Sequence, residues 1–114
     1  MNLIKLSVAR DFSPSPGPRY RWEGEESGQK FREEHLEPNF RKAEAEDGLL
    51  EVNLDGVDGY GTSFLEEAFG GLARVFGVEN VTHRIRIISL EENYRDEVLE
   101  YIRDANKRGA KIAK

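Results

Sequence analysis

Two adjacent hydroxyls, Thr62 and Ser63, are the residues of this chain best placed to do chemistry. They follow a stretch with glycines at 56, 59 and 61, and they open an apolar pattern with helical spacing. Backbone N–H groups at the start of a helix favour a bound or covalently attached phosphate. Three interpretations are therefore open: a phosphate cradle, a site of covalent modification, or a helix N-cap made by one of the hydroxyls.

Known phosphate-binding motifs fit this stretch poorly. No lysine follows the glycines as a P-loop requires, and Phe64 stands where the dinucleotide fingerprint has its third glycine. Asp55 and Asp58 offer oxygen ligands for Mg²⁺, although solvated loop residues are the plainer interpretation. We expect neither a metal nor a cofactor.

The sequence shows no convincing catalytic constellation. There is no cysteine, which excludes thiol nucleophiles and cysteine-based zinc sites. The two histidines, His35 and His83, fall in different predicted elements. A hydrolase that pairs Ser63 with one of them is the weakest alternative, and we expect a protein that is not an enzyme.

A second group of interest is the arginine and aromatic cluster Arg19, Tyr20 and Arg21, followed by Trp22. Residues 1–24 carry four basic side chains against two acidic ones, in a chain whose net charge is −5. Arginine and aromatic side chains are enriched at interaction hot spots, so the cluster could grip an acidic partner or a nucleotide. The alternative is an amphipathic edge strand with Trp22 packed inward.

Alternating apolar residues predict the strands that position these groups. Strands are expected at 4–8, 49–57 and 83–90. The stretch 19–24 also alternates, and across the proline-rich loop before it we predict a fourth strand that pairs back as a wide hairpin.

Helical spacing predicts three helices. The first lies in the polar stretch 29–47, where Pro38 should break or restart it and Gly48 should end it. The second runs from 63 to 76 and contains Gly70 and Gly71, which cost roughly 2 kcal/mol against alanine unless close packing compensates. The third covers about 91–105, after a capping-box pattern at Ser89.

This order of elements predicts an α/β fold in a single domain, residues 1–114. The sheet is expected to be mixed, with about four strands: an N-terminal hairpin plus parallel strand–helix–strand units with right-handed crossovers. Three helices cover it. The basic tail from about residue 107 is expected to fray.

Bulk composition excludes several function classes. An acidic chain with a pI near 5.1 is poorly suited to broad nucleic-acid binding, which depends on neutralising phosphates. No run approaches 18 apolar residues, and the first residues lack the core of a signal peptide. We expect a cytoplasmic protein that binds neither nucleic acid nor membrane.

Two long sequence segments resemble the STAS-like domain family of bacterial and archaeal proteins of unknown function. They are "ARDFSPSPGPRYRWEGEESGQKFREEHLEP" and "VNLDGVDGYGTSFLEEAFGGLAR". The resemblance covers nearly the whole chain. It implies similarity to sulfate-transporter and anti-sigma-factor-antagonist domains, which are mixed α/β folds used for protein–protein switching.

The resemblance also implies a role for the hydroxyls. In the antagonists, a partner kinase phosphorylates a serine at a helix start, and the added charge dissolves the complex. Ser63 stands at the position of that serine and Thr62 at the hydroxyl before it, while Gly61 replaces an acid and Phe64 replaces a glycine. Family members accompany, or are fused to, histidine-kinase-like ATPases, which implies such an ATPase as the partner.

Together these observations predict a non-enzymatic interaction or regulatory module, with Ser63 and Thr62 as candidate modification sites. Glu66 and Glu67 would limit the benefit of a phosphate there. The alternative is a small nucleotide- or phosphate-binding domain that uses residues 59–63 with Arg19 or Arg21. The expected docking or anion-contact surface comprises Asp58, Gly59, Tyr60, Gly61, Phe64, Glu66 and Glu67, with Arg19, Tyr20 and Arg21 as a second contact.

Overall fold

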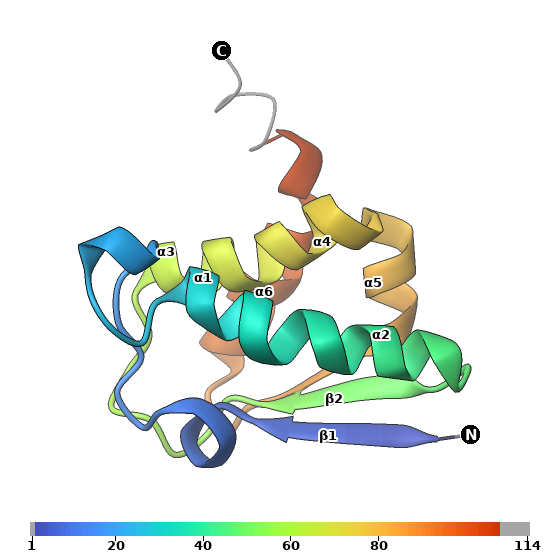
Figure 1. Ribbon diagram of the computed structural model, residues 1–114, viewed down its shortest axis with the longest axis horizontal. Coiled ribbons are helices and arrows are strands. Elements are labelled where there is room, and N and C mark those ends of the chain that lie inside the picture. The colour runs from blue at the N-terminus through green and yellow to red at the C-terminus, as the bar shows by residue number, and fades with distance from the viewer. Residues whose placement is uncertain (1, 108–114) are drawn as a thin grey trace.

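A computed structural model describes residues 2–107 of the chain (Figure 1). Three strands, β1 (Leu3–Ser7), β2 (Leu49–Asn53) and β3 (Ile85–Ile88), form a parallel sheet in the order β1-β2-β3. Leu6 lies opposite Val52, and Val52 lies opposite Ile87. The basic tail that the sequence predicts to fray lies almost wholly outside the described residues.

Two long helical segments cross between the strands. The first crossover contains a π-helical turn η1 (Val8–Phe12), a 3-10 turn η2 (Arg21–Glu23), and then α1 (Gly28–Phe31), η3 (Arg32–Leu36) and α2 (Glu37–Ala45) as one run. The second contains α3 (Thr62–Leu65), η4 (Glu66–Gly70) and α4 (Gly71–Phe76), again continuous, followed by α5 (Val78–Arg84). Helix α6 (Glu92–Arg103) follows β3.

The labelled helices lie on one side of the strands (Figure 1). Right-handed crossovers in the strand order β1-β2-β3 place both helical segments on the same face of the sheet. Burial alternates accordingly, with Leu6, Leu50 and Ile87 buried while Lys5 and Arg86 are exposed. The described residues therefore form a two-layer α/β arrangement in which they leave one sheet face open. Within residues 2–107, none of the helices combines the length and the apolar character needed to cross a bilayer.

The predicted strand at 19–24 is wrong, and the N-terminal hairpin is absent from the described residues. This stretch forms η2 instead, so the sheet has three parallel strands rather than about four in a mixed arrangement. Its backbone donors find local partners: the Tyr20 N–H donates to the Glu23 carboxylate and the Arg21 N–H to the Gln29 side chain. A strand partner is not needed, and Trp22 points outward.

Pro38 does not break the helical run, but α2 begins anew at Glu37 with Pro38 in its first turn, as the restart alternative predicted. The preceding turn widens into η3, where the Glu37 N–H donates to the carbonyl of Arg32, five residues back. A wider turn relieves the clash that a proline ring makes inside an α-helix. The sequence also missed α5, which places His83 in a helix rather than in the third strand. Gly77 ends the second helical segment as predicted, with φ of 95°.

Gly48 does not supply the left-handed turn after α2, because Asp47 does so with φ of 49°. Gly48 is instead required for close approach between chain segments. A Cβ at this position would lie well inside van der Waals contact of the Asn2 carbonyl oxygen. That carbonyl accepts a hydrogen bond from the Leu49 N–H at 2.9 Å, which aligns β1 with β2.

We therefore expect Gly48→Ala to lower the free energy of unfolding by about 1–3 kcal/mol, because rigid backbone must move apart. Urea denaturation measures this loss. The matched control is Gly59→Ala, whose Cβ would meet the nearest atom, the Tyr94 hydroxyl, at an ordinary 3.7 Å. Equal stability of the two variants would contradict the close-approach role of Gly48.

Candidate functional site

The loop between β2 and α3 lies at the carboxyl end of the sheet, the edge where open α/β sheets usually bind ligands. It is tied to the next strand end, because the Asp55 carboxylate accepts a hydrogen bond from the Leu90 N–H at 2.8 Å. Asn53 accepts from the Asp55 N–H at 2.8 Å. The loop therefore has a defined conformation where it enters α3.

Thr62 and Ser63 are both exposed on the first turn of the helical segment. Gly61 occupies the N-cap position and supplies no side chain, so the interpretation of either hydroxyl as the N-cap is wrong. Within the described residues, neither hydroxyl hydrogen bonds to another group. Both are available to a reagent or a partner that approaches from solvent.

The remaining loop residues are held by the neighbouring loop and by aromatic packing. Asp58 accepts a hydrogen bond from the Ser15 hydroxyl at 2.6 Å, and its N–H donates to the Pro14 carbonyl. The Tyr60 hydroxyl donates to the Leu54 carbonyl at 2.7 Å. Burial, with the charge of Asp55 nearby, raises the pKa of Tyr60 well above its usual range. Tyr60 is therefore a structural support of the loop.

The sequence predicted that Phe64, Glu66 and Glu67 belong to an accessible docking surface. The structure buries all three side chains, so this prediction is wrong. Phe64 is 0% exposed, and its ring packs 5.9 Å from that of Phe31 and 6.2 Å from that of Phe12. Glu66 and Glu67 are 2% and 8% exposed. These side chains follow the inward face of the helix, so they are part of the interior.

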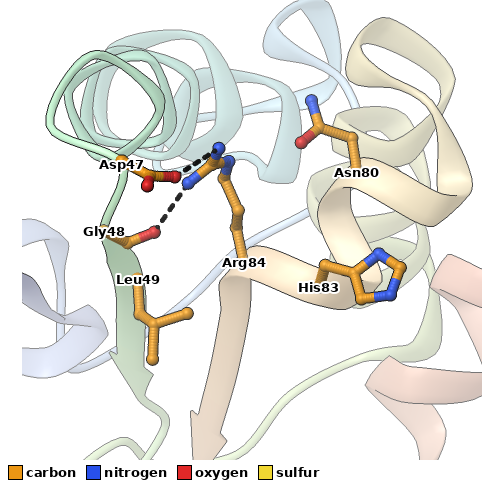
Figure 2. Close-up of a pocket in the computed structure, with 6 residues that line it drawn as sticks. All are labelled: Asp47, Gly48, Leu49, Asn80, His83 and Arg84. Atoms are coloured by element: carbon orange, nitrogen blue, oxygen red, sulfur yellow. Dashed lines mark hydrogen bonds and ion pairs between the residues drawn. The ribbon is translucent and has the colours of Figure 1, made fainter. Parts of the chain in front are cut away.

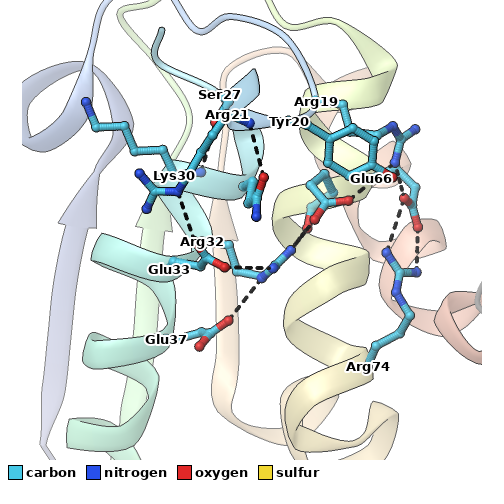
Figure 3. Close-up of polar contacts among 12 residues, drawn as sticks. Arg19, Tyr20, Arg21, Ser27, Lys30, Arg32, Glu33, Glu37, Glu66 and Arg74 are labelled. Atoms are coloured by element: carbon cyan, nitrogen blue, oxygen red, sulfur yellow. Dashed lines mark hydrogen bonds and ion pairs between the residues drawn. The ribbon is translucent and has the colours of Figure 1, made fainter. Parts of the chain in front are cut away.

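Arginines from three parts of the chain surround the two buried carboxylates (Figure 3). Glu66 accepts hydrogen bonds from Arg19 at 2.6 Å and from Arg74 at 2.7 Å. Glu67 accepts from Arg32, whose guanidinium also donates to Glu37 at 3.0 Å. We call Arg19, Arg32, Arg74, Glu37, Glu66 and Glu67 the buried ion network.

Gly70 and Gly71 leave the space that the buried ion network occupies. A Cβ on Gly71 would collide with the guanidinium of Arg32, and one on Gly70 would lie 2.5 Å from the Glu66 carboxylate. The expected compensation, close packing against a neighbouring element, is confirmed for Gly71, whereas Gly70 makes room for side chains of its own helical segment. A glycine pair beside two glutamates was the one sequence signal that could have revealed the buried ion network.

The arginines of the predicted second contact are already paired within the chain. Arg19 belongs to the buried ion network, and Arg21 binds Glu33 at 3.0 Å and Glu34 at 3.1 Å. Only Tyr20 and Trp22 of this cluster present surface that is not committed to an ion pair. A role for Arg19 or Arg21 in holding an external anion would require these pairs to break.

The histidines lie apart from each other. His35 stacks at 6.0 Å on Phe31 in the helix layer, whereas His83 lines a hollow of about 350 Å³ at the amino ends of the strands (Figure 2). Arg84 also lines that hollow and donates to the Gly48 carbonyl at 3.0 Å. Within the described residues, neither histidine hydrogen bonds to Ser63, and no group of three His, Asp or Glu side chains could hold a metal ion.

Residues 27–95 match the family model of the STAS-like domain of unknown function (DUF4325). The match covers more than half of the chain, including β2, β3 and the hydroxyl-bearing turn, so the chain belongs to this family. The resemblance inferred from the sequence is confirmed. No curated protein and no solved structure matches the chain. Family membership supports a regulatory or interaction module at most.

We expect Glu66→Gln to destabilise the fold by about 3 kcal/mol, because it leaves the largely buried Arg74 without a charged partner and Arg19 with only Glu67, at 3.7 Å. Chemical denaturation measures the loss. Glu34→Gln is the matched control, since Glu34 pairs only with Arg21 within the described residues, at a side-chain exposure of 47%, and should cost less than about 1 kcal/mol. Similar costs for the two variants would show that burial of the Glu66 carboxylate is unimportant.

The same carboxylate gives the stability a pH dependence. Burial alone would raise the pKa of Glu66, but hydrogen bonds from Arg74 and Arg19 outweigh it and hold the pKa below 4.5. The contribution of Glu66 is therefore complete above pH 4.5 and is lost as the pH falls through the lowered folded-state pKa. In urea titrations at decreasing pH, the stability difference between wild type and Glu66→Gln should shrink. A constant difference would contradict this assignment.

Proposed function

We propose that this protein is a non-enzymatic partner-switching module that works with a histidine-kinase-like ATPase. It binds its partner through the exposed loop 58–63, and phosphorylation of Ser63 or Thr62 controls the binding. The observation that carries the proposal is the pair of exposed, uncommitted hydroxyls on the first turn of a long helix. They stand on a loop that Asp58, Tyr60 and their partners hold in place.

The orientation of Phe64 supports access to these hydroxyls. A phenylalanine next to Ser63 could have blocked a kinase, but this ring is completely buried among the core aromatics. Gly61 is exposed on the other side, with no atom within 4 Å of the place that a Cβ would take. Neither neighbour in the chain, Gly61 or Phe64, therefore covers the hydroxyls of Thr62 and Ser63.

A phosphate at this turn would change the surface more than the fold. It adds a charge of about −1.5 to −2 beside the helix N-terminus, where negative charge is favourable. Glu66 and Glu67, expected to oppose it, are each paired with arginine, so their repulsion is reduced. The exposed Asp58, nearby in the sequence, adds its negative charge to that of the phosphate. A partner with acidic groups at this contact would therefore be repelled.

A phosphate-binding role for residues 59–63 has weaker support. Such a site would draw on Arg19 or Arg21, and both guanidinium groups are engaged by carboxylates of the same chain. No described observation favours a hydrolase either. We therefore argue only the switching role.

The test is modification by a histidine-kinase-like ATPase from the same organism. After incubation with ATP, mass spectrometry should place a phosphate on Ser63 or Thr62, and the complex should weaken in a pull-down. The double variant Thr62→Ala/Ser63→Ala should stay unmodified and bound. Thr82→Ala, an exposed hydroxyl on α5, is the matched control and should behave as wild type.

Two results would remove the switching role. One is an unmodified pair of hydroxyls in a complex that ATP leaves intact. The other is equal release of the wild type and of the double variant by ATP, which would place the control elsewhere in the chain.

A further inference from the structure

Trp22, the only tryptophan of the chain, faces solvent. Its side chain is 81% exposed, and its ring contact within the described residues is a stack on Tyr20 at 6.1 Å with an interplanar angle of 15°. A tryptophan in this position adds almost nothing to the core. Exposed tryptophans are costly in water and are enriched where proteins bind one another.

The segment that carries Trp22 is well ordered by hydrogen bonds. We call residues 19–30 the Trp22 arm. The Glu23 N–H donates to the Tyr20 carbonyl at 3.0 Å, and the Tyr20 N–H donates in return to the Glu23 carboxylate at 3.0 Å. At its base, the Gly28 N–H donates to the Pro18 carbonyl at 2.8 Å. Because the arm is already ordered, a partner that binds it loses little conformational entropy.

Accessible charge on the arm is acidic, the opposite of the basic cluster read from the sequence. Arg19 is bound in the buried ion network, Arg21 lies between two carboxylates, and Lys30 pairs with Glu26 at 3.3 Å. The arm and the adjoining turn thus hold five carboxylates against two unburied cations. The carboxylates are Glu23, Glu25, Glu26, Glu33 and Glu34.

A hollow of about 350 Å³ lies beside the tryptophan. Trp22, Glu23 and Glu25 contribute to its lining together with two cations, Arg21 and Lys30. Both cations are already paired, with Glu33, Glu34 and Glu26, whereas Glu25 forms no ion pair within the described part of the chain. An aromatic face next to carboxylates is suited to a cation, most of all to the planar guanidinium of arginine.

The Trp22 arm also lies beside the hydroxyl-bearing turn. Gly28, near its end, packs directly on the backbone of Phe64, where a Cβ would come within 2.6 Å of the carbonyl oxygen. A partner docked over Ser63 can therefore reach the arm.

From these observations we infer that the Trp22 arm binds an arginine-bearing segment of the partner protein, with the guanidinium on the free face of Trp22 and within reach of Glu23 and Glu25. The inference rests on the proposed interaction role, and it specifies which kind of side chain the partner contributes to the contact. It does not require modification of Ser63.

The test is a titration of the full chain with a blocked tetra-arginine peptide, followed by the fluorescence of Trp22. We expect a saturable change that added salt weakens, and no change with a blocked tetra-glutamate peptide. Glu25→Gln should weaken binding about two- to five-fold, in line with the small energies of exposed cation contacts. Glu79→Gln, an exposed carboxylate on α5, is the matched control and should bind as wild type.

Trp22→Ala, followed by calorimetry because its fluorescence is lost, should abolish the binding while urea denaturation shows an intact fold. Thr62→Ala/Ser63→Ala should bind the peptide as wild type does, which separates failure of this inference from failure of the switch. The inference is overturned if Trp22→Ala retains full affinity or if Glu25→Gln and Glu79→Gln weaken binding equally. A response to ATP in place of the arginine peptide would also overturn it and would indicate a nucleotide site.

Discussion

The burial of two adjacent carboxylates, Glu66 and Glu67, is the constraint on which the rest of the structure depends. Charged groups removed from water must be paired and hydrogen bonded, or the fold is strongly destabilised. Three arginines meet this requirement from the N-terminal loop, from η3 and from α4. Gly70 and Gly71 leave them room. The buried ion network thus joins segments that hydrophobic packing alone would hold with less specific orientation.

This constraint also positions the candidate surfaces. Glu66 comes directly after the turn that carries Thr62 and Ser63, so the residues that fix the helix also fix the direction of its first turn. Arg19 extends from the same network into the Trp22 arm. The hydroxyl-bearing turn and the exposed tryptophan are therefore held relative to each other by one set of buried contacts, although the loop between β1 and α1 contains little regular structure.

Local patterns predicted the parts of the fold that local physics decides. Alternation identified β1, β2 and β3, and helical spacing identified the segment from Thr62 to Phe76. The stretch 19–24 has the same alternation but forms a turn, because the partner of Arg19 lies 47 residues away and local side chains satisfy the backbone. The hydroxyls could be predicted as candidates from their position before a helix. Burial of the two glutamates left only one local signal, the glycine pair beside them. That pair does not identify the arginines, which are distant in the chain, and charged side chains are rarely buried.

The described strands are all parallel, so a short hairpin cannot join any two of them. Each pair of hydrogen-bonded strands forms only after a helical crossover of tens of residues has brought the two strands together. The chain loses conformational entropy in that closure before any contact between the strands compensates for it. The two crossovers, in contrast, can contact each other directly through Arg32 and Glu67. The topology therefore favours a folding nucleus in the helix layer, with the sheet completed afterwards and at a rate set by chain closure rather than by strand propensity.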